Sequence, residues 1–531
     1  MNGTGTAPEA RPAPSPRSGR IARSVLRGAG IILIVTVFAR IAGFVRYLVF
    51  GASVGAGDVG TAYTTANMLP NVLFEIVAGG ALAAAVVPLI AGLVPERDPE
   101  ETVGTADVPV PAPAAGTTAV PEPSTATPEP TTPAPASPQS AFSPDSPTRP
   151  VPAGAALADR VVSALLTWTV IGTLLLAALV IALAEPLSQL LLASDQTGAA
   201  GVGLGATLLR IFAVQLPFYG ISVVLAAYLQ ARRRFLWPAM MPLLSSLVVM
   251  ASYRVYALLV PSVATVSTID GAAVQWLGWG TTAGVVVMAL PVAIAAARAG
   301  LRVRPALTMP AAHARRALAL GGAGLGAVGA QQIVLALVML LAMRAGGVGT
   351  LPVFQYAQAL YLLPYAVLVV PLVTSVFPHL SELRLVGDVT GFARVAAVSV
   401  RTVIGVSVVG AAMLIAAGPA LGQFFRHIDR AEATGVGSAT AGLALGLVGF
   451  AVATQCTRIL SAALRARDAL MVGAVGWGIA LVALLVLVLP SPARSAAEAA
   501  TAFALAIASG MAVGGLVGLS RIWDMLEHGG H

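Results

Sequence analysis

Long apolar runs alternate with short polar segments along most of the chain. Most of these runs reach the roughly 18–20 residues that an α-helix needs to cross the hydrocarbon core of a bilayer. We predict twelve spans, at about residues 28–50, 61–94, 157–183, 203–230, 236–260, 272–298, 315–343, 352–382, 393–418, 438–464, 468–490 and 497–520. The pattern therefore predicts an all-α polytopic membrane protein.

One polar segment, residues 95–155, is far longer than the other connections. It is rich in Pro, Thr and Ala and contains almost no large apolar side chain. Such a composition cannot bury enough surface to offset the conformational entropy that ordering removes. We therefore expect a disordered cytosolic loop, for which a spacer role is favoured over recognition through its Pro-rich motifs.

Arginine placement predicts the orientation of the spans. Basic residues gather in the N-terminal segment and in every second loop, for example at 232–234 and across 298–316. The intervening loops carry few, and there Arg430 is offset by Asp429. Because cytosolic loops of membrane proteins carry the excess of positive charge, both termini are predicted to be cytosolic.

A repeat becomes visible when the segment 95–155 is set aside. Leu-Pro pairs at 69–70 and 363–364 occupy corresponding places, and later helices end in the similar sequences LQARR and LRARD. The repeat therefore predicts two lobes of six helices each, with the helices in the same order. This arrangement is typical of transporters with a substrate site between the halves. The predicted divisions are a cytosolic basic tail at 1–27, an N-lobe at 28–304, a C-lobe at 305–521 and a cytosolic tail at 522–531.

Composition narrows the function classes. Of 531 residues, 57% are apolar and 10% are charged, and the net charge of +8 is spread over short loops, which indicates membrane orientation and no nucleic-acid partner. Cys456 is the single cysteine and the five histidines are scattered, so neither a disulfide nor a metal site is predicted. The sequence has no phosphate-binding loop, nucleophile elbow or carboxylate cluster, so we predict neither an enzyme nor a cofactor.

Two arginines lie inside the first predicted span, in the segment VFARIAGFVRYLVF at residues 37–50. Arg40 and Arg46 are six residues apart, which places them about 120° apart around a helix and about 9 Å apart along it. An arginine at the centre of a bilayer costs roughly 2.5–3.5 kcal/mol on insertion scales, so such residues normally face a polar interior. We expect both to border a broad cavity, with room for a ligand beside Gly43.

A polar stripe follows in the second span. Tyr63, Asn67, Asn71 and Glu75 recur every four residues along one face of a helix that Pro70 should kink. Two interpretations stay open. In the first, Glu75 neutralises one of the arginines and the asparagines join helices by hydrogen bonds. In the second, the stripe and the arginines line a cationic, water-filled cavity for an anion. A guanidinium bonds two phosphate oxygens at once, so a phosphate ester or pyrophosphate is the anion favoured.

A further arginine, Arg458, lies well inside the tenth span in the segment ATQCTRILSAAL. Its position predicts that it faces the same cavity from the second lobe. The candidate substrate-binding residues are therefore Arg40, Arg46, Asn67, Asn71, Glu75 and Arg458.

Several segments resemble the MurJ/MviN family, the lipid II flippases of bacterial cell-wall synthesis. RIAGFVRYLVFGASVGAG and ANMLPNVLFEIVAGGALAAAVVPL are similar to its amino-terminal signature. LPFYGISVVLAAYLQARRRFLWPAMMPLL and YAQALYLLPYAVLVVPLVTSVFPHLSE also resemble it. The similar segments occur in the same order over about residues 28–470. The use of arginine without lysine and the Pro-rich composition resemble those of actinobacterial members.

The resemblance implies the fold of the MOP exporter superfamily, as in MATE transporters: two six-helix lobes around a central cavity. It implies translocation of lipid II, an undecaprenyl-diphosphate-linked disaccharide-pentapeptide, to the outer leaflet of a bacterial plasma membrane by alternating access. Arg40 and Arg46 match the first-helix arginines taken to bind the pyrophosphate. The implied partners are lipid II, membrane lipid and cell-wall assembly proteins.

The chain departs from the family pattern at several positions. Thr61 stands where many members have an acid, Glu75 and Gly79 replace an arginine and a glutamate, Ala359 replaces an arginine, and twelve spans replace fourteen. Two other functions stay open: export of another prenyl-diphosphate-linked glycan or small amphiphile, and a non-transporting scaffold for cell-wall assembly.

Overall fold

The computed structural model describes residues 16–76, 89, 153–261, 264–490 and 494–528, and most of them are helical. The first half contributes α1 (Pro16–Ser53), α2 (Asp58–Phe74), α4 (Ala153–Ala182), α5 (Ala184–Leu192), α6 (Gly198–Ala213), α7 (Gln215–Ala231), α8 (Leu236–Leu259) and α9 (Gly271–Arg298). The second half contributes α10 (Ala311–Gly346), α11 (Thr350–Pro364), the π-helix η3 (Tyr365–Val369), α12 (Val370–Val386), α13 (Val389–Ile428), α14 (Val436–Leu445), α15 (Leu447–Ala462), α16 (Ala466–Leu487) and α17 (Ala496–His528).

The predicted all-α polytopic architecture is confirmed. Within the described residues, 10 helices are long and apolar enough to cross a membrane, and α14 and α15 together form one more span, bent by 43°. The second predicted span begins as α2, and its remainder lies outside the described residues. So does the predicted disordered loop at 95–155, apart from the first residues of α4.

Several helices extend beyond the predicted spans. α1 begins at Pro16 and α17 continues to His528, and the short helix α5 follows the third span directly. Hydropathy marks only the part of a helix that lies in lipid. The backbone hydrogen-bond ladder can continue into water, so the apolar pattern underestimates the helix lengths.

Two spans change geometry shortly after a proline. α2 contains Pro70 and passes into π-helical turns at residues 75–76, and α11 ends at Pro364 and continues directly as η3. Proline removes a backbone donor and crowds the preceding turn, and a π-bulge is one way in which a helix absorbs such a defect. The two sites are the corresponding Leu-Pro pairs of the sequence repeat.

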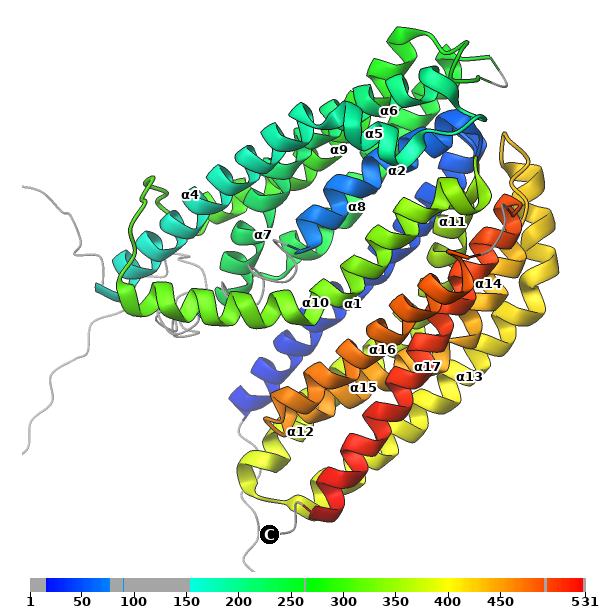
Figure 1. Ribbon diagram of the computed structural model, residues 1–531. Helices are drawn as coiled ribbons and strands as arrows, with labels where there is room; N and C mark the ends of the chain where they lie inside the picture. The colour runs from blue at the N-terminus through cyan, green and yellow to red at the C-terminus, as the bar shows by residue number, and fades with distance from the viewer. Residues whose placement is uncertain (1–15, 77–88, 90–152, 262–263, 491–493, 529–531) are drawn as a thin grey trace, which may run out of the picture.

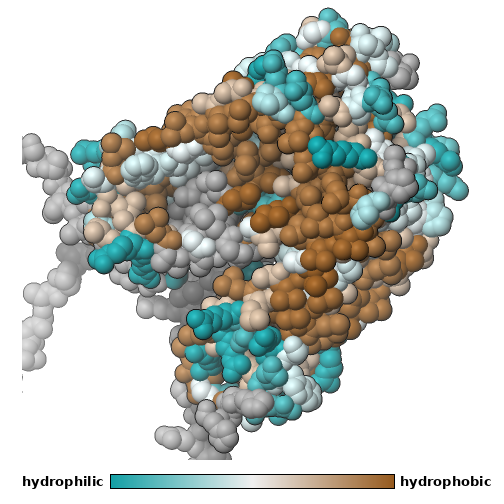
Figure 2. Space-filling view, viewed as in Figure 1, coloured by the Kyte–Doolittle hydropathy of each residue, from teal (hydrophilic) through white to brown (hydrophobic). Residues whose placement is uncertain are grey.

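The helices form two bundles arranged as a V (Figure 1). The first bundle contains α4–α9, with α2 packed on α6 and α1 packed along α8, and the second contains α11–α17. The bundles converge where α1 passes into α2, which we call the closed end. They part where α1 begins and α17 ends, which we call the open end, and Figure 2 shows a recess between them there.

The largest buried cluster joins both bundles near the closed end. Phe50 lies 5.4 Å from Tyr63 and 5.3 Å from Tyr253 between ring centroids, and 6.2 Å from Tyr356 of the second bundle. Phe425 packs on Tyr356 at 4.9 Å. Ring pairs at these separations add roughly 0.5–1.5 kcal/mol each beyond the area they bury. The closed end is therefore a packed interface between the two halves.

α10 contacts both bundles. Near its start, Ala317 and the preceding Met309 pack against a buried cluster of the first bundle that includes Val161 and Tyr228. Its later part packs on α16 and α17 of the second bundle. Between these parts the sequence is LGGAGLGAVG at residues 320–329, and Figure 1 shows α10 bent along its length.

The outer surface is apolar over much of both bundles (Figure 2). Exposed side chains there include Leu175, Leu258 and Met413, which are 67%, 85% and 65% exposed. A soluble monomer rarely shows apolar patches of such extent. This surface therefore agrees with a protein that is surrounded by lipid.

Candidate functional site

Arg46 lines a pocket of about 250 Å³ in the first bundle. Asn67, Asn71 and Glu75 line the same pocket, so four of the six predicted site residues are brought together. The remaining lining residues are Tyr63, Phe74, Tyr219, Ser245, Val249, Thr281 and Val285, from α2, α7, α8 and α9. The expected location of Arg46 beside a polar cavity is thus observed.

The polar stripe faces this pocket because α2 is helical through the whole stripe. Side chains four residues apart lie on one face of a helix, and Tyr63, Asn67, Asn71 and Glu75 accordingly share the pocket. The Nδ2 of Asn71 donates to the backbone oxygen of Asn67 at 2.8 Å. This side-chain hydrogen bond therefore stays within α2 and does not join two helices.

Arg46 keeps its positive charge without a carboxylate partner among the described residues. Its guanidinium carbon lies 5.5 Å from the ring centroid of Tyr47, a cation–π contact. Glu75 lines the same pocket, but within the part of the chain that the structure describes no ion pair joins it to Arg46. The guanidinium can therefore bind an anion that enters the pocket.

Several wall residues were not predicted from the sequence. Tyr219 stacks on Phe74 with ring centroids 4.5 Å apart. The hydroxyl of Tyr63 lies 2.8 Å from that of Tyr253 and 3.0 Å from that of Thr281, which holds the rim of the pocket in place. These residues come from three other helices, and no spacing in the sequence relates them to the stripe on α2.

Arg40 is exposed on α1 and does not line the Arg46 pocket. The helix that carries it, α1, also packs against α11, η3 and α13 of the second bundle. The expectation that both arginines of α1 border one cavity is therefore not met for the Arg46 pocket, which Arg40 does not line.

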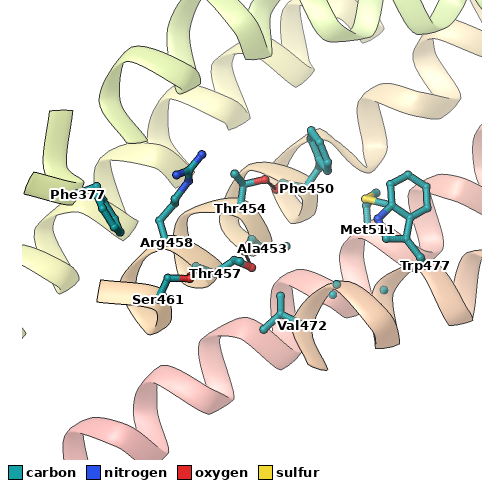
Figure 3. A pocket seen from close by; sticks show the side chains of 13 residues that line it. Phe377, Phe450, Ala453, Thr454, Thr457, Arg458, Ser461, Val472, Trp477 and Met511 are labelled. Atoms are coloured by element: carbon teal, nitrogen blue, oxygen red, sulfur yellow. Dashed lines mark hydrogen bonds between the residues drawn. The ribbon is translucent and has the colours of Figure 1, made fainter. Parts of the chain in front are cut away.

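Arg458 lines a cavity of about 400 Å³ within the second bundle. Figure 3 shows its side chain extending from α15 near Phe377, and its guanidinium carbon lies 6.0 Å from that ring centroid. Hydroxyl groups of Thr454, Thr457 and Ser461 on the same helix also line the cavity. The opposite wall is apolar and consists of Val472, Gly473, Gly476, Trp477, Met511 and Gly514.

The two halves therefore present different surfaces to a ligand. The first offers a small polar pocket with one guanidinium, and the second offers a larger cavity with a guanidinium at a polar edge and an apolar wall. Such a pair of sites suits an amphiphilic anion better than a small inorganic ion.

Comparison with known proteins points to one family. The family model described as the lipid II flippase MurJ matches residues 153–523. A curated relative, the probable lipid II flippase MurJ of Synechocystis sp., is 35% identical over 86 residues. That match covers 16% of this chain and spans only 15% of the relative's length.

Solved structures share the fold over nearly the whole chain. A lipid II flippase MurJ in an inward closed conformation superposes with a TM-score of 0.66 at 18% identity, over 93% of this chain and 87% of that one. An inward-facing MATE multidrug transporter of the MOP superfamily gives 0.63 at 12% identity, over 93% and 96% of the two chains. The predicted MOP-type fold is therefore confirmed.

Proposed function

Because the chain belongs to the MurJ lipid II flippase family, we propose that it carries lipid II from the cytosolic to the outer leaflet of the plasma membrane. It is a multi-pass membrane protein with the fold of the MOP superfamily. The observation that carries the proposal is the position of Arg46, which lines a polar pocket of the membrane-spanning bundle and has no carboxylate partner within the residues that the structure describes.

The chemistry of Arg46 fits the diphosphate of lipid II. Burying a charge in a membrane protein is costly unless a partner or water offsets the cost. An aromatic neighbour offsets part of it here, and a diphosphate oxygen would supply the missing counter-charge. A guanidinium can bind such a group through two parallel charge-assisted hydrogen bonds. Asn67 and Asn71 would add neutral polar contacts, as the predicted site requires.

The remaining arginines extend this proposal towards the second half. We assign Arg40 and Arg458 to the capture of the head group, because Arg40 is exposed on α1, which packs against both bundles, and Arg458 lines the cavity of the second bundle. The polar disaccharide and peptide would lie in water between the bundles, while the prenyl chain stays in lipid. Glu75 limits the positive charge of the first pocket and so favours release of the anion.

The proposed orientation places the open end in the cytosol. α1 begins and α17 ends at this end (Figure 1), and the arginine-rich loop at 232–234 joins α7 to α8. The excess of arginine predicts the cytosolic side, so the conformation would be open to the cytosol. Transport would then require the two predicted lobes, 28–304 and 305–521, to rock about the membrane plane.

The membrane potential is sufficient to bias such a cycle. Moving one elementary charge across the membrane is worth about 2.3 kcal/mol per 100 mV. A diphosphate that crosses with its arginine partners therefore feels a driving force that depends on the net charge of the complex.

The proposal is tested by complementation and by transport of labelled lipid II into vesicles. Arg40→Ala and Arg46→Ala should fail to support growth of a strain depleted of its flippase, and should lower translocation by purified protein. Arg254→Ala is the matched control, because Arg254 is an exposed arginine of α8 that does not line the pocket. Normal growth and transport with both Arg40→Ala and Arg46→Ala would refute the assigned roles.

The two other functions make different predictions. A scaffold should fail when residues 98–152 are deleted, whereas a flippase should retain transport. If the protein exports another prenyl-linked glycan, its depletion should not cause lipid II to accumulate on the cytosolic side. If it is a lipid II flippase, its depletion should cause this accumulation.

A further inference from the structure

The loops at the closed end bind the two halves of the chain to each other. The α1–α2 loop of the first half meets the α13–α14 loop of the second. Val348 and Gly349, which precede α11, add backbone hydrogen bonds of 2.8 Å each to the side chains of Gln196 and Thr61 in the first half. The closed end therefore has directional contacts in addition to its aromatic packing.

Asp429 is the centre of these contacts. It is 3% exposed, and both of its carboxylate oxygens accept from the backbone N–H of Ala56 in the first half, at 3.0 and 3.1 Å. Within the second half it accepts from the hydroxyl of Tyr356 at 2.7 Å and from the N–H of Ala431 at 2.8 Å. A buried carboxylate needs such donors, because leaving it without them would cost several kcal/mol or force its protonation.

Arg430 extends the contact to the ends of two helices. Its backbone N–H donates to the carbonyl of Gly51 near the end of α1 at 2.9 Å. Its Nη2 donates to the carbonyl of Ala257 near the end of α8 at 3.3 Å. The last carbonyls of a helix have no partner within the helix and carry partial negative charge, so an arginine from the other half is a suitable partner.

The first half provides space for this loop through glycine. A Cβ at Gly51 would lie 3.2 Å from both Asp429 Oδ2 and the Tyr356 hydroxyl. Gly55 has a φ of +82°, and a Cβ there would lie 3.0 Å from the backbone nitrogen of Ala431. Any side chain at these positions would push the two loops apart. The close approach therefore depends on residues from both halves.

We propose that Asp429, Arg430 and Ala431 form a clasp that holds the closed end shut. The clasp must release for the transporter to open to the outer side of the membrane. The inference deepens the proposed function and rests on its alternating-access cycle. Opening would expose Asp429 and Arg430 to water, which hydrates both charges. The clasp is therefore reversible, because the hydrogen bonds lost on opening are replaced by bonds to solvent.

A disulfide across the clasp tests whether this end must open. A Cβ at Gly57 would lie 3.5 Å from the Cβ of Ala431, within the range of a disulfide, and Gly57 has an ordinary φ of −75°. The pair Gly57→Cys and Ala431→Cys would be made in a Cys456→Ala background. Oxidation should abolish lipid II translocation, a reductant should restore it, and the single-cysteine variants should not respond to oxidant.

Translocation at the same rate in the oxidised and reduced pair, with the crosslink verified, would overturn the clasp and leave the flippase function intact. Failure of the reduced pair and of the parent protein to move lipid II would instead contradict the proposed function. The clasp would then be decided by a measurement that needs no substrate.

That measurement is labelling of a reporter cysteine from the outer side. Ser53 is fully buried beside the clasp, so Ser53→Cys in the Cys456→Ala background should react slowly with a membrane-impermeant thiol reagent. Asp429→Asn removes the charge and replaces one acceptor oxygen by a donor, and should raise the labelling rate at least tenfold. Arg426→Ala, an exposed residue in the last turn of α13, is the control and should leave the rate unchanged. Equal rates in Asp429→Asn and the parent would overturn the proposal.

Discussion

Substitution of Arg46 gives the most direct measure of anion binding in the first pocket. Arg46→Ala removes the guanidinium from a pocket in which, among the described residues, it has no carboxylate partner. The substitution therefore breaks no ion pair among the described residues, and the lost affinity reports on the ligand. Arg46→Lys keeps the charge but removes the planar fork.

The expected magnitude follows from the number of hydrogen bonds. A fork that binds a diphosphate makes two charge-assisted hydrogen bonds, each worth about 1.5–3 kcal/mol. Their loss in Arg46→Ala should weaken binding by roughly 10²–10⁴-fold, since about 1.4 kcal/mol corresponds to a factor of ten. Arg46→Lys should lose one bond and weaken binding by about 10–100-fold on the same scale.

The assay is calorimetric titration of the purified protein with a lipid II analogue that has a shortened prenyl chain. Thermal unfolding of each variant without ligand separates a binding defect from a folding defect. Arg254→Ala is again the control and should bind like the parent. Affinity of Arg46→Ala within about threefold of the parent, which is under about 0.7 kcal/mol, would refute the reasoning.

Three further outcomes follow from the structure. Glu75→Gln removes a negative charge from the wall of the Arg46 pocket, so it should tighten binding in the same titration and slow release. Gly446→Ala should lower the melting temperature, because its Cβ would lie 2.6 Å from a backbone atom of α17, whereas Gly478→Ala in α16 has open space and should be neutral or mildly stabilising. The Gly391 N–H donates to Asp388 at 2.8 Å and lowers the pKa of this carboxyl. The support that this hydrogen bond gives to the first turn of α13 is thus present above the ordinary carboxyl pKa and is lost as the pH falls through the lowered pKa of Asp388. The protection of the Gly391 amide against hydrogen exchange should therefore fall only in that acidic range.

The pattern of apolar runs was sufficient to predict the fold class. The spacing of Asn67, Asn71 and Glu75 was sufficient to predict a shared face, because a helix relates residues four apart without knowledge of other helices. Arg46 could be predicted to lie beside that face because the free-energy cost of an arginine in lipid restricts it to a polar surface. These predictions succeeded where a local rule determined the result.

Contacts between distant segments could not be predicted in the same way. Tyr219 and Thr281 reach the pocket through the packing of α7 and α9, which no periodicity encodes. Asp429 was interpreted only as a charge that offsets Arg430 in an outward loop, yet it is buried and binds Ala56 in the first half. Hydropathy separates loops from spans, but it contains no information on which loops meet.

The course of α10 has a consequence for how the molecule deforms. A rod fixed to two bodies at its two ends cannot follow both when they rotate against each other, so curvature must concentrate at its least stiff segment. In α10 that segment is the stretch at 320–329, since glycine weakens a helix by roughly 0.5–1 kcal/mol per residue relative to alanine. We therefore expect any rotation of the halves against each other to bend α10 at residues 320–329, and replacement of glycines there by alanine to make the helix stiffer.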